Sequence, residues 1–179
     1  MDATVIAMNI LEAVKERRSI RAFQEKAIPQ EALDQIIEAI LWAPSAGNLQ
    51  SRFFYFVFER KLKTKLARAA LDQFFISDAP LAIVACCDLR IEGHYGRRGR
   101  DLYTIQDVAA SIQNLMLVAH EIGLGSVWVG AFDEKKVFET LEIPNHLRPV
   151  AIVPVGYPAE FPSPPPRVAK KDAVTIIRS

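Results

Sequence analysis

Apolar residues with helical spacing alternate along this chain with short, continuous apolar runs. Two segments show the spacing of an amphipathic helix, residues 8–17 and 61–71, and a third begins at Pro29 and ends before Pro44. A longer segment, 101–122, has apolar residues on several faces, which predicts a buried central helix. Residues 134–141 predict one further helix.

Strands are predicted from the apolar runs at 53–58, 80–88, 126–129 and 149–156. The runs at 80–88 and 149–156 lack polar alternation, so we expect these strands to be covered on both faces. Residues 89–101, rich in glycine and arginine, are predicted to be a loop. Helices mixed with about four strands, without a repeat or a composition shift, predict one α+β domain over residues 1–179.

The end of the chain predicts an extended C-terminal arm from about residue 158. Its proline-rich part, 158–166, cannot form a regular element, and residues 175–177 predict a last short strand. An apolar strand at the end of an arm needs a sheet to join, in its own copy or in a partner copy. The residues favour neither of these two possibilities.

Charge, hydropathy and cysteine content argue against a nucleic-acid-binding, membrane or secreted protein. Lys and Arg number 22 against 21 Asp and Glu, a net charge of +1, which gives no reason to expect nucleic-acid or membrane-surface binding. The apolar runs are too short to cross a membrane, and the first residues lack the features of a secretory signal. Cys86 and Cys87 are adjacent and are interpreted as reduced and buried. We therefore expect a cytoplasmic protein.

The segment Arg17-Arg18-Ser19-Ile20-Arg21 is the first candidate for binding chemistry. Guanidinium forks and a serine hydroxyl suit a phosphate. In an extended segment Arg17, Ser19 and Arg21 face the same side, which suits one phosphate group. The alternative is a solvated helix C-terminus, where basic residues are favoured, and the segment taken alone favours it.

Three further segments carry candidate binding residues. In 44–50, Asn48 and Gln50 present donors and acceptors that suit the edge of a planar heterocycle, although a helix stop followed by a turn has the same composition. In 123–130, glycines would let the backbone approach a flat ligand, or would form a helix cap and a tight strand. In 164–167, a rigid proline arm would direct Arg167 towards an anion, or would be a solvated tail.

The predicted loop Arg90–Arg100 contains four arginines. They are interpreted either as contacts for the phosphates of a nicotinamide cofactor or an acidic substrate, or as part of a mobile solvated loop, with equal weight. The histidines at 94, 120 and 146 lack the spacing of metal ligands, so no metal site is predicted.

These segments occur in the same order in the nitroreductase-like flavoproteins, which the chain resembles over nearly its whole length. Residues 16–23 resemble the phosphate-binding signature of that family, and residues 43–50 resemble its second signature. Residues 107–126 resemble its central helix and the following turn. Residues 155–158 and 164–167 resemble its ending. Each segment alone is weak evidence, but their shared order is strong. For residues 17–21 and 44–50 it therefore favours ligand binding over the helix end and the turn.

The resemblance implies an α+β nitroreductase-like fold with a central, mainly antiparallel sheet of about four to five strands surrounded by helices. It also implies an FMN cofactor at the interface of a homodimer. By this resemblance, the phosphate and ribityl end of FMN would be held by Arg17, Arg18, Ser19 and Arg21. The flavin ring would be lined by Pro44, Ser45 and Asn48, with Gln50 near it. Backbone N–H groups of Val129 and Gly130 would lie near the reactive flavin nitrogen and carbonyl, and Arg167 would return to the phosphate.

The activity implied by the resemblance is electron transfer from NAD(P)H to a small acceptor, such as a nitroaromatic or a quinone, in a ping-pong cycle. Hydride transfer to a flavin requires no acid or base, so no catalytic side chain is predicted. The alternatives are a flavin-binding module without NAD(P)H turnover and a non-flavin phosphate-binding interaction domain. The chain has Gln50-Ser51-Arg52-Phe53 where many relatives have Gln-Pro-Trp, and Arg52 is a candidate additional anion-binding group.

Overall fold

Four antiparallel strands form one sheet in the order β1-β2-β4-β3, in a computed structural model that describes residues 9–178. The strands are β1 (Arg52–Val57), β2 (Leu81–Asp88), β3 (Gly125–Ser126) and β4 (Leu147–Gly156). This confirms the predicted mainly antiparallel sheet. The predictions for residues 1–8, which include the start of the first helix and the missing secretory signal, lie outside the described residues.

Strand β2 is buried on both faces, as its continuous apolar run predicts. Leu81 and Ile83 point into a cluster with α2 and α6, whereas Ala82 and Val84 point into a second cluster with α3 and α7. Because side chains alternate along a strand, apolar residues at every position fit a strand between two layers. The sheet is therefore the middle layer of the molecule.

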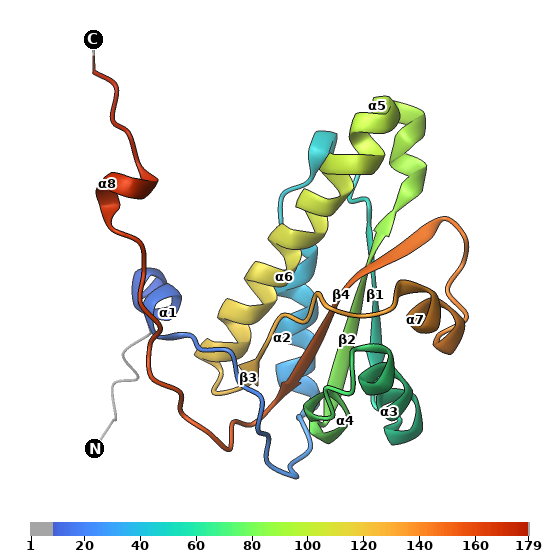
Figure 1. Cartoon of the computed structure of the whole chain (residues 1–179), viewed down its shortest axis with the longest axis vertical. Helices are drawn as coiled ribbons and strands as arrows, with labels where there is room; N and C mark the ends of the chain where they lie inside the picture. Colours follow the sequence, from blue (N-terminus) through green and yellow to red (C-terminus); the bar gives the residue numbers. More distant parts are fainter. Residues whose placement is uncertain (1–8, 179) are drawn as a thin grey trace.

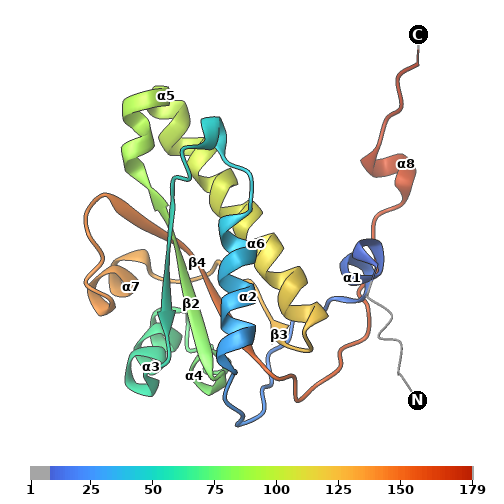
Figure 2. The ribbon, with the colours of Figure 1, turned by 180° about the vertical axis from the view of Figure 1, so that it is seen from behind.

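Helices cover the two faces of the sheet (Figures 1 and 2). On one face lie α2 (Gln30–Leu41) and the long central helix α6 (Thr104–Glu121). The other face is covered by α3 (Arg60–Ala69), α4 (Phe75–Asp78) and α7 (Glu134–Thr140). Of these five helices, α2, α3, α6 and α7 confirm predicted segments, whereas α4 has only four residues and shows no detectable period in the sequence.

The prediction of a loop at 89–101 is wrong. This stretch consists of a 3-10 turn (Leu89–Ile91), α5 (Glu92–Arg98) and a π-helical turn (Gly99–Tyr103). Gly99 serves helix packing, because a Cβ there would lie 2.8 Å from Tyr95 Cβ, and Gly96 has a positive φ of 57°. Two of its arginines pair with carboxylates, Arg90 with Asp88 and Arg100 with Glu92. The sequence predicted a loop here because these local pairings leave no periodic pattern.

The C-terminal arm is present, but its last strand is not formed. Beyond residue 158 the chain leaves the body of the molecule, forms the short helix α8 (Lys170–Ala173) and continues without regular structure (Figures 1 and 2). The helix α1 (Ile10–Glu16) lies beside this arm in both views. The predicted strand 126–129 is also shorter, because only Gly125–Ser126 pairs regularly and Val129 forms an isolated bridge.

Among residues 9–178, no helix combines the length and the apolar composition that a membrane span requires.

Candidate functional site

The segment Arg17–Arg21 follows α1 and runs beside β3. The backbone N–H of Arg17 donates to the carbonyl oxygen of Ala13 at 3.0 Å and ends the helix. Three residues later, the N–H of Ile20 donates to the carbonyl oxygen of Ser126 at 3.1 Å, and Ser19 forms a parallel bridge with Ser126. The segment is therefore extended, as predicted, and it is held by backbone contacts.

The guanidinium groups of Arg17, Arg18 and Arg167 gather at the start of this segment, and no carboxylate among residues 9–178 pairs with them. Burial lowers the pKa of Arg17, and the neighbouring charges of Arg18 and Arg167 lower this pKa further. None of the three arginines forms a salt bridge within residues 9–178. The Nη1 atom of Arg17 is buried and has no hydrogen-bond acceptor in the described part of the chain. A buried, unpartnered donor among repelling cations is a site prepared for an anion.

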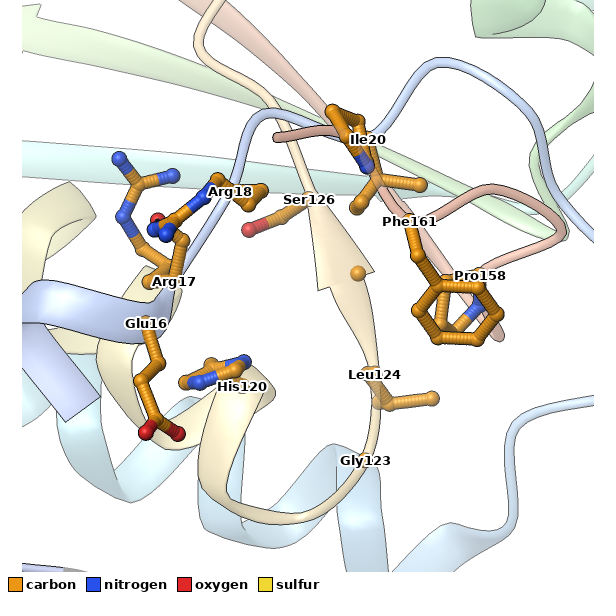
Figure 3. Close-up of a pocket in the computed structure, with 12 residues that line it drawn as sticks. Glu16, Arg17, Arg18, Ile20, His120, Gly123, Leu124, Ser126, Pro158 and Phe161 are labelled. Carbon is orange, nitrogen blue, oxygen red and sulfur yellow. Dashed lines mark hydrogen bonds between the residues drawn. The ribbon is translucent and has the colours of Figure 1, made fainter. Parts of the chain in front are cut away.

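A cavity of about 370 Å³ adjoins Arg17 and Arg18 (Figure 3). Its floor includes His120, near the end of α6, and Phe161 lies over Pro158 on the opposite side. The Nε2 atom of His120 is the second buried side-chain atom without a partner among the described residues. Burial is the main cause that lowers the pKa of His120, with the charges of the two arginines adding to it. The cavity thus combines apolar walls with cationic and imidazole groups.

Arg18 and Arg21 have different surroundings from Arg17. The Nη1 atom of Arg18 donates to the carbonyl oxygens of Lys15 at 2.6 Å and Arg17 at 2.9 Å, so it also caps α1. Arg21 lines another hollow, together with Lys63. Extended chain rises about 3.3 Å per residue, which places Arg21 about 13 Å beyond Arg17. The expectation that both arginines hold one phosphate group therefore stays a prediction, and this spacing favours a contact of Arg21 further along the same ligand.

Arg167 lies near enough to Arg17 for the two charges to repel each other, and its return to a phosphate stays a prediction. Its charge lowers the pKa of Arg17, and its own Nη1 donates to the carbonyl oxygens of Pro165 and Pro166 at 3.1 and 3.2 Å. The start of the arm is fixed, because the carboxylate of Glu160 accepts from the backbone N–H of Arg21 at 2.5 Å.

The turn Pro44–Gln50 follows α2 and has an unusual backbone. Gly47, Asn48 and Gln50 have positive φ values of 55°, 58° and 52°. The hydroxyl oxygen of Ser45 accepts from the N–H of Gln50 at 3.0 Å, which closes the turn. The side chains of Pro44, Asn48 and Gln50 are exposed. The turn therefore presents these side chains outwards on a folded backbone.

Arg52 is a structural residue. Its Nη2 donates to the carbonyl oxygens of Leu41 and Ala43, each at 2.9 Å, and its Nη1 donates to that of Pro44 at 3.3 Å. These are carbonyl groups that the end of α2 leaves without partners. The guanidinium is consequently not free to bind an anion, in contrast to the interpretation from the sequence.

The two predicted halves of the site lie at opposite ends of α6. Near the beginning of the helix, Asp107 accepts from the N–H of Ala46 in the turn at 2.9 Å. Near its end, His120 lines the cavity with Arg17. His120 lies 13 positions after Asp107, which corresponds to about 20 Å of helix. A single copy therefore does not bring the turn and the arginine cluster together.

Val129 and Gly130 differ in what their backbones offer. The N–H of Val129 donates to the carbonyl oxygen of Ile152 at 2.9 Å, so it is not available to a ligand. This corrects the role predicted for Val129. The N–H of Gly130 makes no hydrogen bond to any described residue, and Gly130 is exposed. Only Gly130 keeps a free donor for the edge of a flat ligand.

Asp107 and His120 are the residues that sequence reasoning missed. Both sit on the predicted central helix, and each gains its importance from contacts with segments distant in the sequence. One signal was available for Asp107, because a carboxylate in the first turn of a mostly apolar helix is favoured by the helix dipole. A comparable signal exists for His120, because a basic residue in the last turn of a helix is also favoured by the helix dipole.

Comparison with known proteins places this geometry in context. The sequence model of the Nitroreductase family matches residues 14–91 and 73–157. A relative from Methanothermobacter thermautotrophicus, with the provisional name NADH dehydrogenase/NAD(P)H nitroreductase, is 36% identical over 90% of this chain and 84% of its own length. The FMN reductase [NAD(P)H] of Bacillus subtilis is 28% identical over 91% of this chain and 71% of its own.

Solved structures agree with the sequence relatives. NfrA2 from B. megaterium superimposes with a TM-score of 0.86 at 27% identity, covering 94% of this chain and 74% of its own. The NADPH:FMN oxidoreductase of Vibrio harveyi, solved as a complex with NAD+, gives a TM-score of 0.87 at 26% identity, covering 95% of this chain and 77% of its own. From the matched segments, the shared fold and the relatives, the chain belongs to the nitroreductase family.

Proposed function

We propose that this protein is an FMN-dependent oxidoreductase that passes electrons from NAD(P)H to a small acceptor such as a nitroaromatic or a quinone. The observation that carries the proposal is the buried, unpartnered Nη1 of Arg17 within a cluster of three arginines. A phosphate monoester supplies the negative charge and the acceptor oxygens that this cluster lacks. The relatives named as FMN reductases and the NADPH:FMN oxidoreductase support this choice of ligand.

The residues present fit FMN along one extended segment. Arg17, Ser19 and Arg167 would hold its phosphate, and Arg18 would add charge beside them. Arg21, further along, would contact the ribityl or ring end. The free N–H of Gly130 would donate to the edge of the ring. Bound FMN supplies the hydride-accepting chemistry, and the protein binds it, orients it and shields it from water.

The remaining ring contacts would come from a second copy in a homodimer. Pro44, Ser45, Asn48 and Gln50 are separated by the length of α6 from the arginine cluster of their own chain, so these residues of the partner subunit would complete each site. Two apolar surfaces support association. One is the exposed face of α1 with Ile10, Leu11 and Val14; the other is the end of the arm, where Val174, Ile176 and Ile177 are 54%, 61% and 91% exposed.

The edge strand β1 offers a place for the end of the arm. One side of β1 pairs with β2, and its other side has no strand neighbour among the described residues. An unpaired edge favours addition of a strand from another chain. We therefore infer that residues 175–177 cross to the sheet of the partner subunit, and that residues 1–179 form one domain with an exchanged arm.

A cytoplasmic location is part of the same proposal. Cys86 and Cys87 are free and buried. Burial raises the pKa of Cys86 to about 12 and that of Cys87 to about 11, so both thiols stay protonated and unreactive. This suits a reducing compartment.

Anaerobic titration tests the function directly. The purified protein is loaded with FMN, freed of unbound flavin and titrated separately with NADH and NADPH while the visible flavin absorbance is followed. We expect one nucleotide or both to bleach the flavin, and a nitroaromatic or a quinone to restore the colour. Failure to bind FMN contradicts the proposal, and a non-flavin phosphate-binding interaction domain is then the remaining alternative. Binding without bleaching leaves the flavin module without turnover.

A further inference from the structure

The buried carboxylate of Asp107 joins the two ends of the Pro44–Gln50 turn. Its Oδ1 accepts from the backbone N–H of Ala46 at 2.9 Å, and its Oδ2 accepts from the hydroxyl of Ser51 at 2.7 Å. Asp107 is only 4% exposed and Ser51 only 5%. One side chain of α6 thus fixes the entry and the exit of the turn.

Neighbouring contacts strengthen the exit. The hydroxyl of Thr104, one helical turn before Asp107, donates to the carbonyl oxygen of Ser51 at 2.5 Å. The N–H of Asp88 at the end of β2 donates to the same carbonyl at 3.0 Å. Ser51 is therefore held by α6 through both its side chain and its backbone, and the position of the turn follows the position of α6.

The turn requires such support because its backbone is strained. Asn48 and Gln50 have φ values of 58° and 52°, in the left-handed region that is unfavourable for residues with a side chain. Such conformations persist only where surrounding contacts determine them. The bond from the Gln50 N–H to the Ser45 hydroxyl closes the turn from within, and the hydrogen bonds of Asp107 anchor it to α6.

We propose that Asp107 is a positioning residue, which holds the Pro44–Gln50 turn in the conformation that binds the flavin ring. The inference rests on the proposed function, in which the turn contacts the ring of FMN. Asp107 acts through the Ala46 N–H and the Ser51 hydroxyl, and it contacts neither the ring nor the phosphate. Its loss should therefore weaken binding of the ring and leave the binding of the phosphate group intact.

Two flavins separate these effects. FMN carries a phosphate and riboflavin does not, while both carry the same ring. The experiment measures dissociation constants of both flavins by fluorescence titration for the full-length wild type and for Asp107→Leu, Asp107→Asn, Ser51→Ala and Arg17→Ala. Each titration is made well below the unfolding temperature of the variant concerned, so that differences in fold stability do not enter.

Ser111→Ala is the matched control. Ser111 is fully buried on α6, one turn after Asp107, and its hydroxyl donates to the carbonyl oxygen of Ile40 at 3.1 Å. The variant therefore removes a buried hydrogen bond between α6 and α2, and leaves the turn contacts in place. It reports the effect of a purely structural loss on the same helix.

We expect Asp107→Leu to weaken FMN and riboflavin by the same factor, about tenfold or more, because two buried donors lose their acceptor. Asp107→Asn should bind nearly as the wild type does, since its amide oxygen can accept from Ala46 and its NH₂ can donate to Ser51. Arg17→Ala should weaken FMN alone. If Asp107→Leu does not fold, Ser51→Ala should show a smaller loss that is equal for both flavins.

Three results overturn the inference. The first is unchanged flavin affinity in Asp107→Leu or, where that variant does not fold, in Ser51→Ala. The second is a loss confined to FMN, and the third is an equal loss in Ser111→Ala. A wild type that binds neither flavin overturns the proposed function and the inference together, which distinguishes that failure from the failure of Asp107 alone.

Discussion

Ile20 packs directly against Gly125. A Cβ at position 125 would lie 2.7 Å from Ile20 Cγ1 and 2.8 Å from Ile20 Cβ, closer than any ordinary contact. The N–H of Ile20 also donates to the carbonyl oxygen of Ser126. Gly125 thus allows the arginine-bearing segment to lie against β3. Of the two interpretations of this glycine from the sequence, the structure supports the tight strand rather than the approach of a flat ligand, because the side chain of Ile20 occupies that space.

Replacing Gly125 by alanine should therefore displace the segment that carries Arg17. We expect Gly125→Ala to lower the free energy of unfolding by about 1–3 kcal/mol, the usual cost of overpacking, and to weaken FMN binding. Urea denaturation and FMN titration measure the two effects. The control is Gly93→Ala in α5, where a Cβ would meet no atom within 4 Å. Equal stability of both variants would contradict the role given to the Ile20 contact.

Removal of the Arg17 guanidinium should separate cofactor binding from fold stability. We expect Arg17→Ala to weaken FMN by about 1.5–3 kcal/mol, the range of a hydrogen bond to a charged group, without lowering the free energy of unfolding of the FMN-free protein. The free energy of unfolding should not fall, because in the FMN-free protein the Arg17 guanidinium is partly desolvated and its Nη1 has no acceptor among the described residues. Calorimetric titration and urea denaturation provide the measurements. Arg68→Ala, on the exposed side of α3, is the control and should change neither.

His120 should make the stability of the FMN-free protein depend on pH. Burial is the main cause that lowers its pKa below the usual 6.5; Glu16 opposes it with the next largest effect, and Arg17 and Arg18 add to the lowering. The folded state therefore favours the neutral imidazole, and the unfolded state binds the proton more readily. The stabilisation is fully present above pH 6.5 and is lost as the pH falls from there towards the folded-state pKa.

Urea denaturation between about pH 8 and about pH 5 measures this dependence. His120→Gln removes the titrating group and should flatten the curve within that window. Bound FMN should also flatten it, because a nearby phosphate offsets the repulsion between the imidazolium and the two arginines. An unchanged pH dependence in His120→Gln would assign the effect to other groups.

The apolar end of the arm should control oligomeric state. We expect Ile176→Asp with Ile177→Asp to convert a dimer into monomers, because both side chains are exposed in a single copy and would be buried in the partner. Sedimentation velocity measures the change. FMN should bind more weakly to the monomer, which lacks the second turn. Lys171→Ala, in the exposed helix α8, is the control; a wild type that sediments as a monomer would refute the exchange of arms.

The layered fold was predictable because burial on two faces leaves a local signature. The runs that became β2 and β4 are apolar at successive positions, and the pattern of α6 is apolar on several faces. The stretch 89–101 was misinterpreted since its helices depend on the close packing of Gly99 and on the pairs of Arg90 with Asp88 and Arg100 with Glu92, which leave no period in the sequence. Residues 175–177 form no strand here because a strand requires a neighbour, which no described segment provides.

The site was predictable only in part. Arg17 and Arg167 followed from the order of the motifs, and the structure brings their charges together. The Val129 N–H was assigned to a ligand, whereas it bonds to Ile152, a residue 23 positions away that local sequence does not indicate. Asp107 was missed for the same reason, since its partner Ala46 lies 61 positions away.

Because α6 separates the arginine cluster from the turn of the same chain, two defective variants should complement each other in a mixed dimer. In the proposed dimer each chain supplies the arginine cluster of one site and the turn of the other. A mixed dimer of Arg17→Ala and Asp107→Leu chains would collect both defects in one site and leave the second site intact. Two weakened proteins, unfolded and refolded together, should therefore complement each other and recover flavin binding that neither has alone.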